Sequence, residues 1–276
     1  MYVRVVHTVK EVREFLDSRK NIGLVPTMGA LHAGHEKLIQ VARSECELVA
    51  VSIFVNPLQF GPNEDYGRYP QALSQDLEMC ERNRVDLVFI PSVKDMYPQP
   101  QFTMVEVGRL DVHLCGKFRP GHFQGVATVV LKLLNIVQPH RAFFGEKDMQ
   151  QLAIIRRSVL DLNVPVTIVG VPTVREADGL ALSSRNRYLN PEERKAAPEL
   201  YRALKEARSR IQGGERDVAK IREATLQVLQ SSPLIRVEYF EIVDTEELQP
   251  VHEITDQVRI AAAIWIGNTR LIDNVY

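Results

Sequence analysis

The sequence predicts an α/β protein in which a doubly wound parallel sheet is followed by a smaller α+β domain. Over the first two thirds of the 276 residues, short apolar runs alternate with helical patterns. This alternation is typical of a parallel sheet with helices on both faces. After Pro172 the chain carries two charged amphipathic segments and then three apolar runs with no helix between them. We therefore predict one domain at residues 1–172 and a second at residues 173–276.

The first domain's strands and helices follow from hydrophobic periodicity. Strands are predicted at Ile22–Pro26, Leu48–Val55, Asp86–Ile90, Arg141–Phe144 and Val166–Val171. Helices are predicted at Ser74–Asn83 and Asp148–Leu162, and Leu38–Val41 falls within another. One more apolar helix face has i, i+3, i+4, i+7 spacing and consists of Val126, Val129, Val130, Leu133, Leu134 and Val137.

The second domain begins with two predicted helices, Pro191–Gln212 and Glu215–Gln230, joined by Gly213-Gly214. Asn190 followed by Pro191 is a typical helix start, because asparagine caps the free N–H groups and proline fits the first helical position. Three strands follow, at Ile235–Val243, Val258–Ile266 and Thr269–Val275. Because no helix separates these strands, we expect an antiparallel sheet.

Composition narrows the functional class. The formal net charge is −1, so no overall positive field favours nucleic acid or an anionic membrane. No apolar stretch approaches the ~18 residues that span a bilayer, and the N-terminus lacks the apolar segment of a signal peptide, so we expect a cytoplasmic protein. Cys46, Cys80 and Cys115 share no CxxC spacing, which favours buried thiols over disulfides or a zinc site.

The stretch PTMGALHAGH, residues 26–35, lies where a strand gives way to a helix. Ligands of doubly wound sheets bind at the carboxyl ends of the strands. Gly29 and Gly34 allow close backbone approach, and the helix start offers free N–H groups to a phosphate. His32 and His35 lie three residues apart, so both imidazoles can donate hydrogen bonds to charge that builds on a reacting phosphorus. Two polar histidines that cap a helix are the plainer alternative.

Four motifs together resemble the pantoate–β-alanine ligase family, a member of the HxGH nucleotidylyltransferase superfamily with a Rossmann-like sheet. They are PTMGALHAGH, FVNPLQF at 54–60, GEKDMQQ at 145–151 and LSSRN at 182–186, in the family's order and approximate spacing. The resemblance covers nearly the whole chain. It implies ATP-dependent ligation of pantoate to β-alanine through a pantoyl-adenylate, with release of AMP and pyrophosphate. It also implies Mg²⁺ with the ATP, and a homodimer.

The resemblance also implies roles for individual residues. His35 and His32, together with Lys147, act on the α-phosphate and the departing pyrophosphate. Gln59 contacts pantoate and β-alanine, Gln151 contacts pantoate, and Asn56 lies nearby. The implied ATP-binding residues are Met28, Gly29, Ala30, Leu31, His32, Ala33, Gly34, His35, Gly145, Glu146, Lys147, Asp148, Val174, Leu182, Ser183, Ser184 and Arg185.

The residue types agree with these roles. Lys147 supplies a flexible cation for phosphate, and Ser183, Ser184 and Arg185 supply hydroxyl and guanidinium donors. Asp178-Gly179 predicts a turn that precedes the Ser183–Arg185 loop, and the second domain is expected to act as a lid. The alternatives are a simple loop with a surface glutamine for FVNPLQF, a capped helix with solvated charges for GEKDMQQ, and an interdomain salt-bridge loop for LSSRN.

Several points stay open at this stage. Asp65 and Asp76 are candidates to help hold Mg²⁺, but the metal ligands are unknown. The roles of Lys117, Arg119 and His122, in the stretch GKFRPGHFQG, are also unassigned.

Three other functions fit part of the sequence pattern. One is a nucleotidylyltransferase that releases a stable nucleotide-linked product. Another is a non-catalytic nucleotide-binding module. The last is a metal-binding protein built on His32, His35 and His113.

Overall fold

The computed structural model describes residues 3–17, 21–62, 64–254 and 257–276. The contacts divide the chain into two compact units. The first comprises Met1–Val107, Arg119–Glu146 and Gln151–Pro172, and the second comprises Gly108–Phe118, Lys147–Gln150 and Thr173–Tyr276. Gly108–Phe118 and Lys147–Gln150 therefore interrupt the first unit and belong to the second. The remaining division lies after residue 172, where the sequence suggests a boundary.

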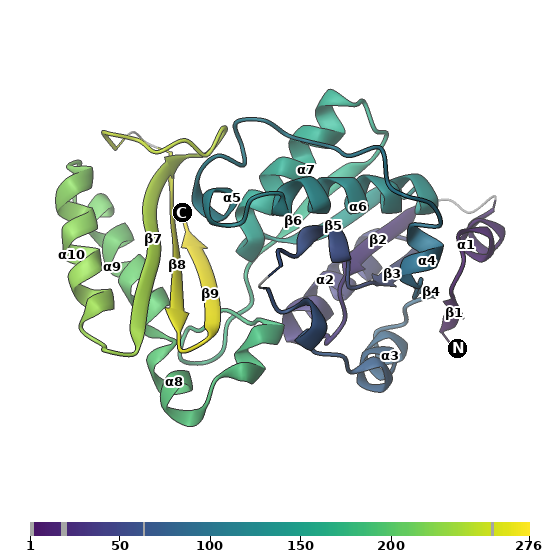
Figure 1. The fold of residues 1–276 in the computed structure, drawn as a ribbon, viewed down its shortest axis with the longest axis horizontal. Coiled ribbons are helices and arrows are strands. Elements are labelled where there is room, and N and C mark those ends of the chain that lie inside the picture. The colour runs from purple at the N-terminus through teal and green to yellow at the C-terminus, as the bar shows by residue number, and fades with distance from the viewer. Residues whose placement is uncertain (1–2, 18–20, 63, 255–256) are drawn as a thin grey trace. The chain divides into compact units, whose positions relative to one another are not determined.

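The first unit is built on a parallel sheet, as predicted (Figure 1). Within the described residues the strand order is β1-β4-β3-β2-β5-β6. The strands are β1 (Arg4–Val6), β2 (Ile22–Thr27), β3 (Leu48–Ile53), β4 (Leu87–Phe89), β5 (Arg141–Gly145) and β6 (Thr167–Val171). From β2 the chain builds outward through β3 and β4, and β5 then starts the other half beside β2. The switch point, where such sheets bind ligands, therefore lies between β2 and β5.

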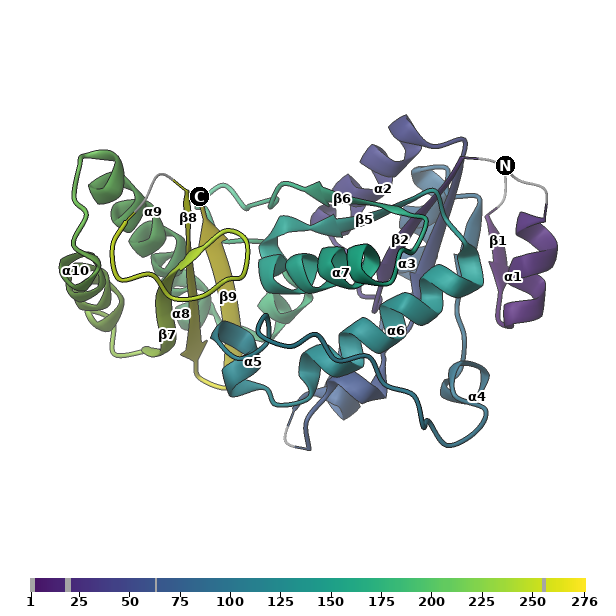
Figure 2. The ribbon, with the colours of Figure 1, turned by 90° about the horizontal axis from the view of Figure 1, so that it is seen from above.

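Helices cover both faces of this sheet. They are α1 (Val9–Leu16), α2 (Ala33–Glu45), α3 (Leu73–Arg82), α4 (Val93–Met96), α6 (His122–Val137) and α7 (Met149–Asp161). Helix α2 packs on one face against β2, β3 and β5, whereas α6 and α7 lie on the other (Figure 2). The predicted apolar face of α6 is confirmed, because the six residues predicted to form it are all buried.

The edge strand β1 and helix α1 were not predicted from the sequence. Strand β1 has only three residues and pairs with β4, which begins more than eighty residues later. A strand this short offers too few positions for a period-two pattern to be recognised. Its pairing depends on a neighbour that local sequence does not reveal.

The second unit contains the predicted antiparallel sheet in the order β7-β8-β9. Its strands are β7 (Ile235–Asp244), β8 (Val258–Ile266) and β9 (Thr269–Val275). Helices α9 (Glu199–Gln212) and α10 (Val218–Gln230) pack against it and against each other, and α5 (Leu114–Phe118) and α8 (Pro191–Ala196) are shorter. Phe240 and Leu204 are fully buried between the sheet and these helices.

The predicted bounds of two helices in this unit were wrong. The helix expected at Pro191–Gln212 is two helices, because Pro198 lacks the N–H that a continuous helix requires. The next helix begins at Val218 rather than Glu215. Asp217 is its cap and accepts the backbone N–H groups of Ala219 and Lys220.

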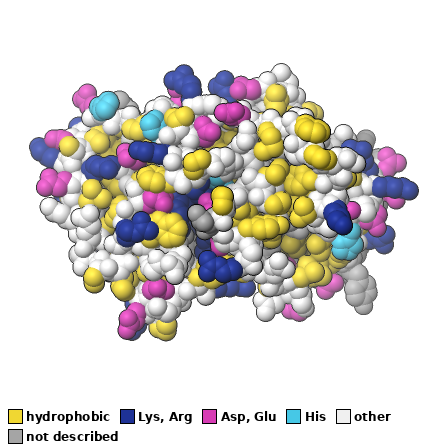
Figure 3. Space-filling model, in the orientation of Figure 1, with side chains coloured by type: hydrophobic (Ala, Val, Ile, Leu, Met, Phe, Trp, Pro, Cys, Tyr) yellow, Lys and Arg dark blue, Asp and Glu magenta, His cyan; other side chains and the backbone are white. Residues whose placement is uncertain are grey.

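Acidic and basic side chains are interspersed on the face drawn in Figure 3, in line with the near-neutral net charge. Among the described residues, no helix is both long and apolar enough to cross a membrane. Cys46, Cys80 and Cys115 are free and buried, as the sequence predicts.

Candidate active site

The PTMGALHAGH stretch forms the turn between β2 and α2, at the carboxyl edge of the parallel sheet. Gly29 has φ +82°, and Ala30 follows with φ +48°. A Cβ atom on Gly29 would lie 3.0 Å from a methyl carbon of Ile53, so both space and backbone conformation favour glycine here. The predicted junction between a strand and a helix is present here.

A buried carboxylate holds the turn. Asp76 of α3 accepts the backbone N–H of Ala30 at 2.9 Å and that of Leu31 at 2.7 Å, one with each oxygen. Asp76 is only 2% exposed. The sequence suggested Asp76 as a candidate for Mg²⁺, whereas the structure shows both of its oxygens bound to the loop.

The two histidines are fixed by the helix start. His32 caps α2, and its Nδ1 accepts the N–H of Gly34 at 3.1 Å. The Nδ1 of His35 accepts the N–H of His32 at 3.3 Å. Because an accepting Nδ1 carries no proton in a neutral imidazole, both rings hold their proton on Nε2. Each half-buried ring therefore has an Nε2–H donor, which the chemistry suggested by the sequence requires.

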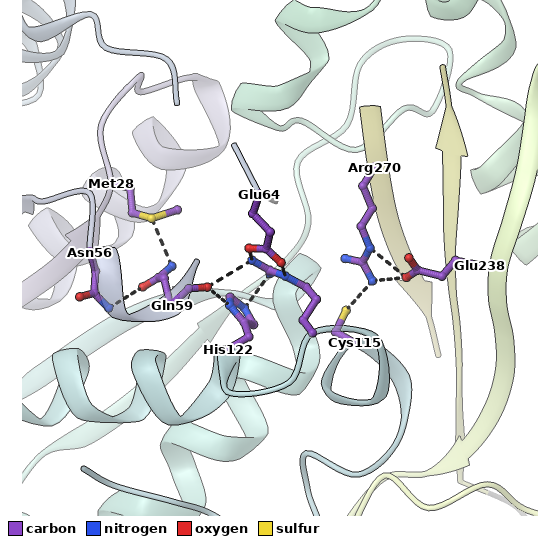
Figure 4. A network of polar contacts seen from close by, with 9 residues as sticks. Met28, Asn56, Gln59, Glu64, Cys115, His122, Glu238 and Arg270 are labelled. Carbon is purple, nitrogen blue, oxygen red and sulfur yellow. Dashed lines mark hydrogen bonds and ion pairs between the residues drawn. The ribbon is translucent and has the colours of Figure 1, made fainter. Parts of the chain in front are cut away.

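The FVNPLQF motif lies beside the same turn (Figure 4). Gln59 donates from Nε2 to the sulfur of Met28 at 3.2 Å, and Asn56 donates from Nδ2 to Oε1 of Gln59 at 3.1 Å. Tyr97 donates to Oδ1 of Asn56 at 2.8 Å, and burial raises the pKa of Tyr97 to about 12, so it stays a donor at neutral pH. The structure thus brings the buried amides of Asn56 and Gln59 together with the half-buried Met28.

A glycine allows this cluster to sit tightly against α6. The carbonyl of Gly125 accepts a hydrogen bond from Asn56 Nδ2 at 3.2 Å. A Cβ atom at Gly125 would lie 2.3 Å from the carbonyl oxygen of Leu58, so any larger residue would displace the turn that carries Gln59.

Arg119 and His122, whose roles the sequence left open, hold the backbone of Gln59. His122 Nδ1 lies 2.8 Å from the Gln59 carbonyl oxygen, and Arg119 Nη1 lies 2.8 Å from His122 Nε2. Since Arg119 can only donate, His122 accepts at Nε2 and donates from Nδ1. Arg119 also binds both oxygens of Glu64.

The pKa of Glu64 reflects this contact. Burial raises the pKa of the carboxyl, but the hydrogen bonds and positive charge of Arg119 outweigh that effect and lower it below its ordinary value. The sequence signal for this network was a cluster of basic residues before a helix.

Gln151 is half-buried in the first turn of α7, and the described hydrogen bonds do not join it to Gln59. Its neighbour Gln150, which sequence reasoning missed, is 4% exposed and anchors residues 108–118. Gln150 accepts the N–H of Cys115 and donates to the carbonyls of Leu110 and His113. Its role in the second unit is therefore structural.

The GEKDMQQ motif spans the end of β5 and a short 3₁₀ turn, Glu146–Asp148. Gly145, Glu146, Lys147 and Asp148 are all half-buried. Lys147 Nζ lies 3.5 Å from Oδ1 of Asp148. Asp148 therefore partly balances the charge of Lys147.

The LSSRN motif follows a hairpin in the second unit. The N–H of Leu182 donates to the carbonyl of Val174 at 3.0 Å, and the predicted turn at Asp178-Gly179 is present, with φ +96° at Gly179. Ser183 caps the turn Ser184–Tyr188 by accepting the N–H of Arg185 at 3.3 Å. Ser184 is buried and Arg185 half-buried.

The second unit also contains a buried charged cluster, drawn in Figure 4. Arg270 binds Glu238, and its Nη2 lies 3.5 Å from the sulfur of Cys115, which itself lies 3.2 Å from the hydroxyl of Tyr239. These contacts fix α5 to the antiparallel sheet.

The metal-binding alternative relied on His32, His35 and His113. The part of the chain that the structure describes contains no group of three or more His, Cys, Asp or Glu side chains able to hold a metal ion. His32 and His35 instead use their Nδ1 atoms to fix the start of α2.

Comparisons with known proteins identify the family. Residues 4–276 match the model of the Pantoate-beta-alanine ligase family. The pantothenate synthetase of Thermotoga petrophila is 51% identical over 276 residues, covering 99% of each chain. That of Thermosipho africanus is 53% identical over 277 residues, with the same coverage.

Comparison with solved structures points to the same family. The pantothenate synthetase of Thermus thermophilus is 51% identical, with a TM-score of 0.96 and 99% of each chain covered. The pantoate-beta-alanine ligase of Francisella tularensis, described as complexed with beta-gamma ATP and beta-alanine, is 36% identical, with a TM-score of 0.82 over 99% of this chain and 97% of that one. This chain therefore belongs to the pantoate–beta-alanine ligase family.

Proposed function

We propose that this chain joins pantoate to β-alanine in two steps that consume ATP. In the first step, a carboxylate oxygen of pantoate attacks the α-phosphorus of ATP, the bond to the bridging oxygen breaks, and pyrophosphate leaves. In the second, the amine of β-alanine attacks the acyl carbon of the pantoyl-adenylate. AMP then leaves with its bonding electron pair, and the amine gives up a proton.

The observation that supports this proposal most strongly is the paired orientation of His32 and His35. Both Nδ1 atoms accept backbone N–H groups, so both Nε2 atoms are donors. Hydrogen-bond donors fixed before the reaction stabilise charge that develops on the α-phosphate and on the departing pyrophosphate. No covalent enzyme intermediate is needed, and catalysis consists of positioning and charge stabilisation.

The remaining residues are assigned to binding. We assign Lys147, with Gly145, Glu146 and Asp148, and the loop of Leu182, Ser183, Ser184 and Arg185, with Val174, to ATP. The turn of residues 28–35 is assigned to the nucleotide as well. We assign Gln59 to pantoate and β-alanine, and Gln151 and Asn56 to the pantoate pocket. The buried contacts of Gln59 and Asn56 support this, since they hold the amide groups in one orientation.

Two further assignments concern Mg²⁺ and assembly. Mg²⁺ usually takes few protein ligands and many from phosphates, so we propose that it enters with ATP. Because Asp76 is bound to the turn, we assign no residue of this chain to the metal. We also propose a cytoplasmic homodimer, in line with the family resemblance, and a second domain that acts as a lid.

The test is incubation with ATP, Mg²⁺ and pantoate, with or without β-alanine. We expect pyrophosphate in a single turnover without β-alanine, and AMP with the amide product only when β-alanine is present. Pyrophosphate that appeared only with β-alanine would contradict the stepwise mechanism. A stable nucleotide-linked product, unaffected by added amine, would favour the nucleotidylyltransferase alternative, and binding without any turnover would favour a non-catalytic module.

A further inference from the structure

The side chain of Asn274 holds the backbone of Lys147. Asn274 lies in β9 and is 6% exposed. Its Oδ1 accepts a hydrogen bond from Arg259 Nη1 at 2.9 Å, and its Nδ2 donates to the carbonyl of Lys147 at 3.0 Å. Because a guanidinium only donates, Arg259 fixes the oxygen side of the amide, and the nitrogen side must face Lys147.

The preceding residue, Asp273, holds a second segment. Its two oxygens accept from Nη1 and Nη2 of Arg175 at 2.5 and 2.9 Å, and its side chain is 2% exposed. Arg175 Nη1 also donates to the carbonyl of Gly179 at 3.1 Å, and its guanidinium lies 3.7 Å from the ring centre of Tyr201. Arg175 is therefore held in one position by an anion, a carbonyl and an aromatic face.

Arg175 begins the hairpin that leads to the LSSRN motif. It pairs with Ala181, and the hydrogen bond from Leu182 to Val174 closes the hairpin. Ser183 and Arg185 follow directly. The position of this loop therefore depends on Arg175, and through Arg175 on Asp273.

The burial and the charge of Asp273 indicate that it needs Arg175 as a partner. Desolvation raises the pKa of Asp273, while the hydrogen bonds and charge of Arg175 act in the opposite direction. A buried carboxylate left without its partner is strongly destabilising, so the Asp273–Arg175 pair is expected to form as a unit.

We propose that Asp273 and Asn274 are positioning residues for ATP, which fix the Lys147 turn and the Val174–Arg185 segment relative to each other from one strand. This rests on the proposed function, in which both segments bind the nucleotide. Lys147 and Arg185 would otherwise have to be ordered separately when ATP arrives. Donors that are held in place beforehand bind more tightly because less conformational entropy is lost.

The sharpest test is Asn274→Asp. This variant keeps the size of the side chain and an acceptor for Arg259, but it loses the donor to the Lys147 carbonyl. The net loss of one hydrogen bond corresponds to a change in affinity of roughly two- to thirteenfold, so we expect the KM for ATP to rise by about that factor. The KM for pantoate should stay unchanged. The affinity for adenosine, which lacks phosphates, should fall less than the affinity for ATP.

Trp265→Phe is the matched control. Trp265 lies on β8 in the same sheet, and the variant also loses one side-chain hydrogen bond, from Nε1 to Glu238. It should lower the unfolding temperature without changing the KM for ATP. Asn274→Asp and Trp265→Phe are first compared by thermal unfolding. Asn274→Ala, which also removes the donor to the Lys147 carbonyl but adds no charge, replaces Asn274→Asp if that variant does not fold.

The outcomes separate the two proposals. If the wild-type protein does not convert ATP, pantoate and β-alanine, the proposed function fails. If the wild type is active and Asn274→Asp lowers stability while leaving the KM for ATP and the preference for ATP over adenosine unchanged, Asn274 is only structural and the positioning proposal is overturned.

Discussion

His35 and His32 are linked through the backbone as well as through their rings. The Nδ1 of His35 accepts the N–H of His32 at 3.3 Å, and the two ring centres lie 4.1 Å apart. His35 therefore has two separable tasks, which are to cap the start of α2 and to present Nε2–H. A variant that keeps the first task but removes the second can distinguish them.

We predict that His35→Ala and His35→Glu both lower turnover, by roughly 10²–10³-fold or more, because each removes one donor to the transition state. An ionised glutamate at this third helical position can still accept the His32 N–H but has no donor, so His35→Glu should be the more stable of the two. Turnover and thermal unfolding are measured for each. His252→Ala, at an exposed position, is the control, and unchanged turnover in both His35 variants would remove His35 from the mechanism.

Gln59→Glu should raise the KM for pantoate more than the KM for ATP. A glutamate keeps the acceptor for Asn56 but places a negative charge where the pantoate carboxylate is proposed to bind. Steady-state kinetics with each substrate varied in turn provide the measurement, and Gln40→Glu on the exposed side of α2 is the matched control. A selective loss of ATP affinity would instead place Gln59 in the nucleotide site.

Asp76→Asn should loosen the turn that carries both histidines. An asparagine can accept only one of the two N–H groups of Ala30 and Leu31, and its NH₂ group would face the other. An unsatisfied buried donor costs about 1–3 kcal/mol, so the free energy of unfolding should fall by that amount in urea titration. Turnover should fall as well. Glu78→Gln, exposed on the same helix, should leave both quantities unchanged.

The Glu64–Arg119 pair predicts a pH dependence of stability. The folded pKa of Glu64 is lowered, so the pair contributes its full stability above the ordinary glutamate pKa of 4.5, and this contribution is lost as the pH falls through the folded value. The free energy of unfolding of Glu64→Gln should therefore fall less than that of the wild type between pH 6 and about pH 3, which lies below the ordinary glutamate pKa. Unfolding temperatures across this range test the prediction.

The control for the pH experiment is Glu14→Gln, which removes an exposed pair with Lys10. Surface pairs contribute little, so its curve should follow that of the wild type. Identical curves for Glu64→Gln and the wild type would show that the carboxylate of Glu64 has the same pKa in the folded and unfolded chain.

The sequence alone determined the features that depend on local pattern. The strands from β2 to β9 follow from apolar runs, because a buried strand needs several consecutive apolar residues. The turn at Gly29 and the cap at Asn190 follow from local residue chemistry, because glycine tolerates a positive φ and the asparagine side chain accepts free N–H groups at a helix start. The grouping of histidines and glycines at the end of β2 was also visible, since neighbours in sequence remain neighbours at a strand end.

Only the tertiary structure decided which distant side chains hold those motifs in place. Asp76 lies 45 residues from Leu31, and Asn274 lies 127 residues from Lys147. A carboxylate or amide in the sequence shows what it can bind but not which backbone group it meets. That choice depends on how the elements pack, because a buried polar group must find its partner wherever folding brings one within hydrogen-bond distance.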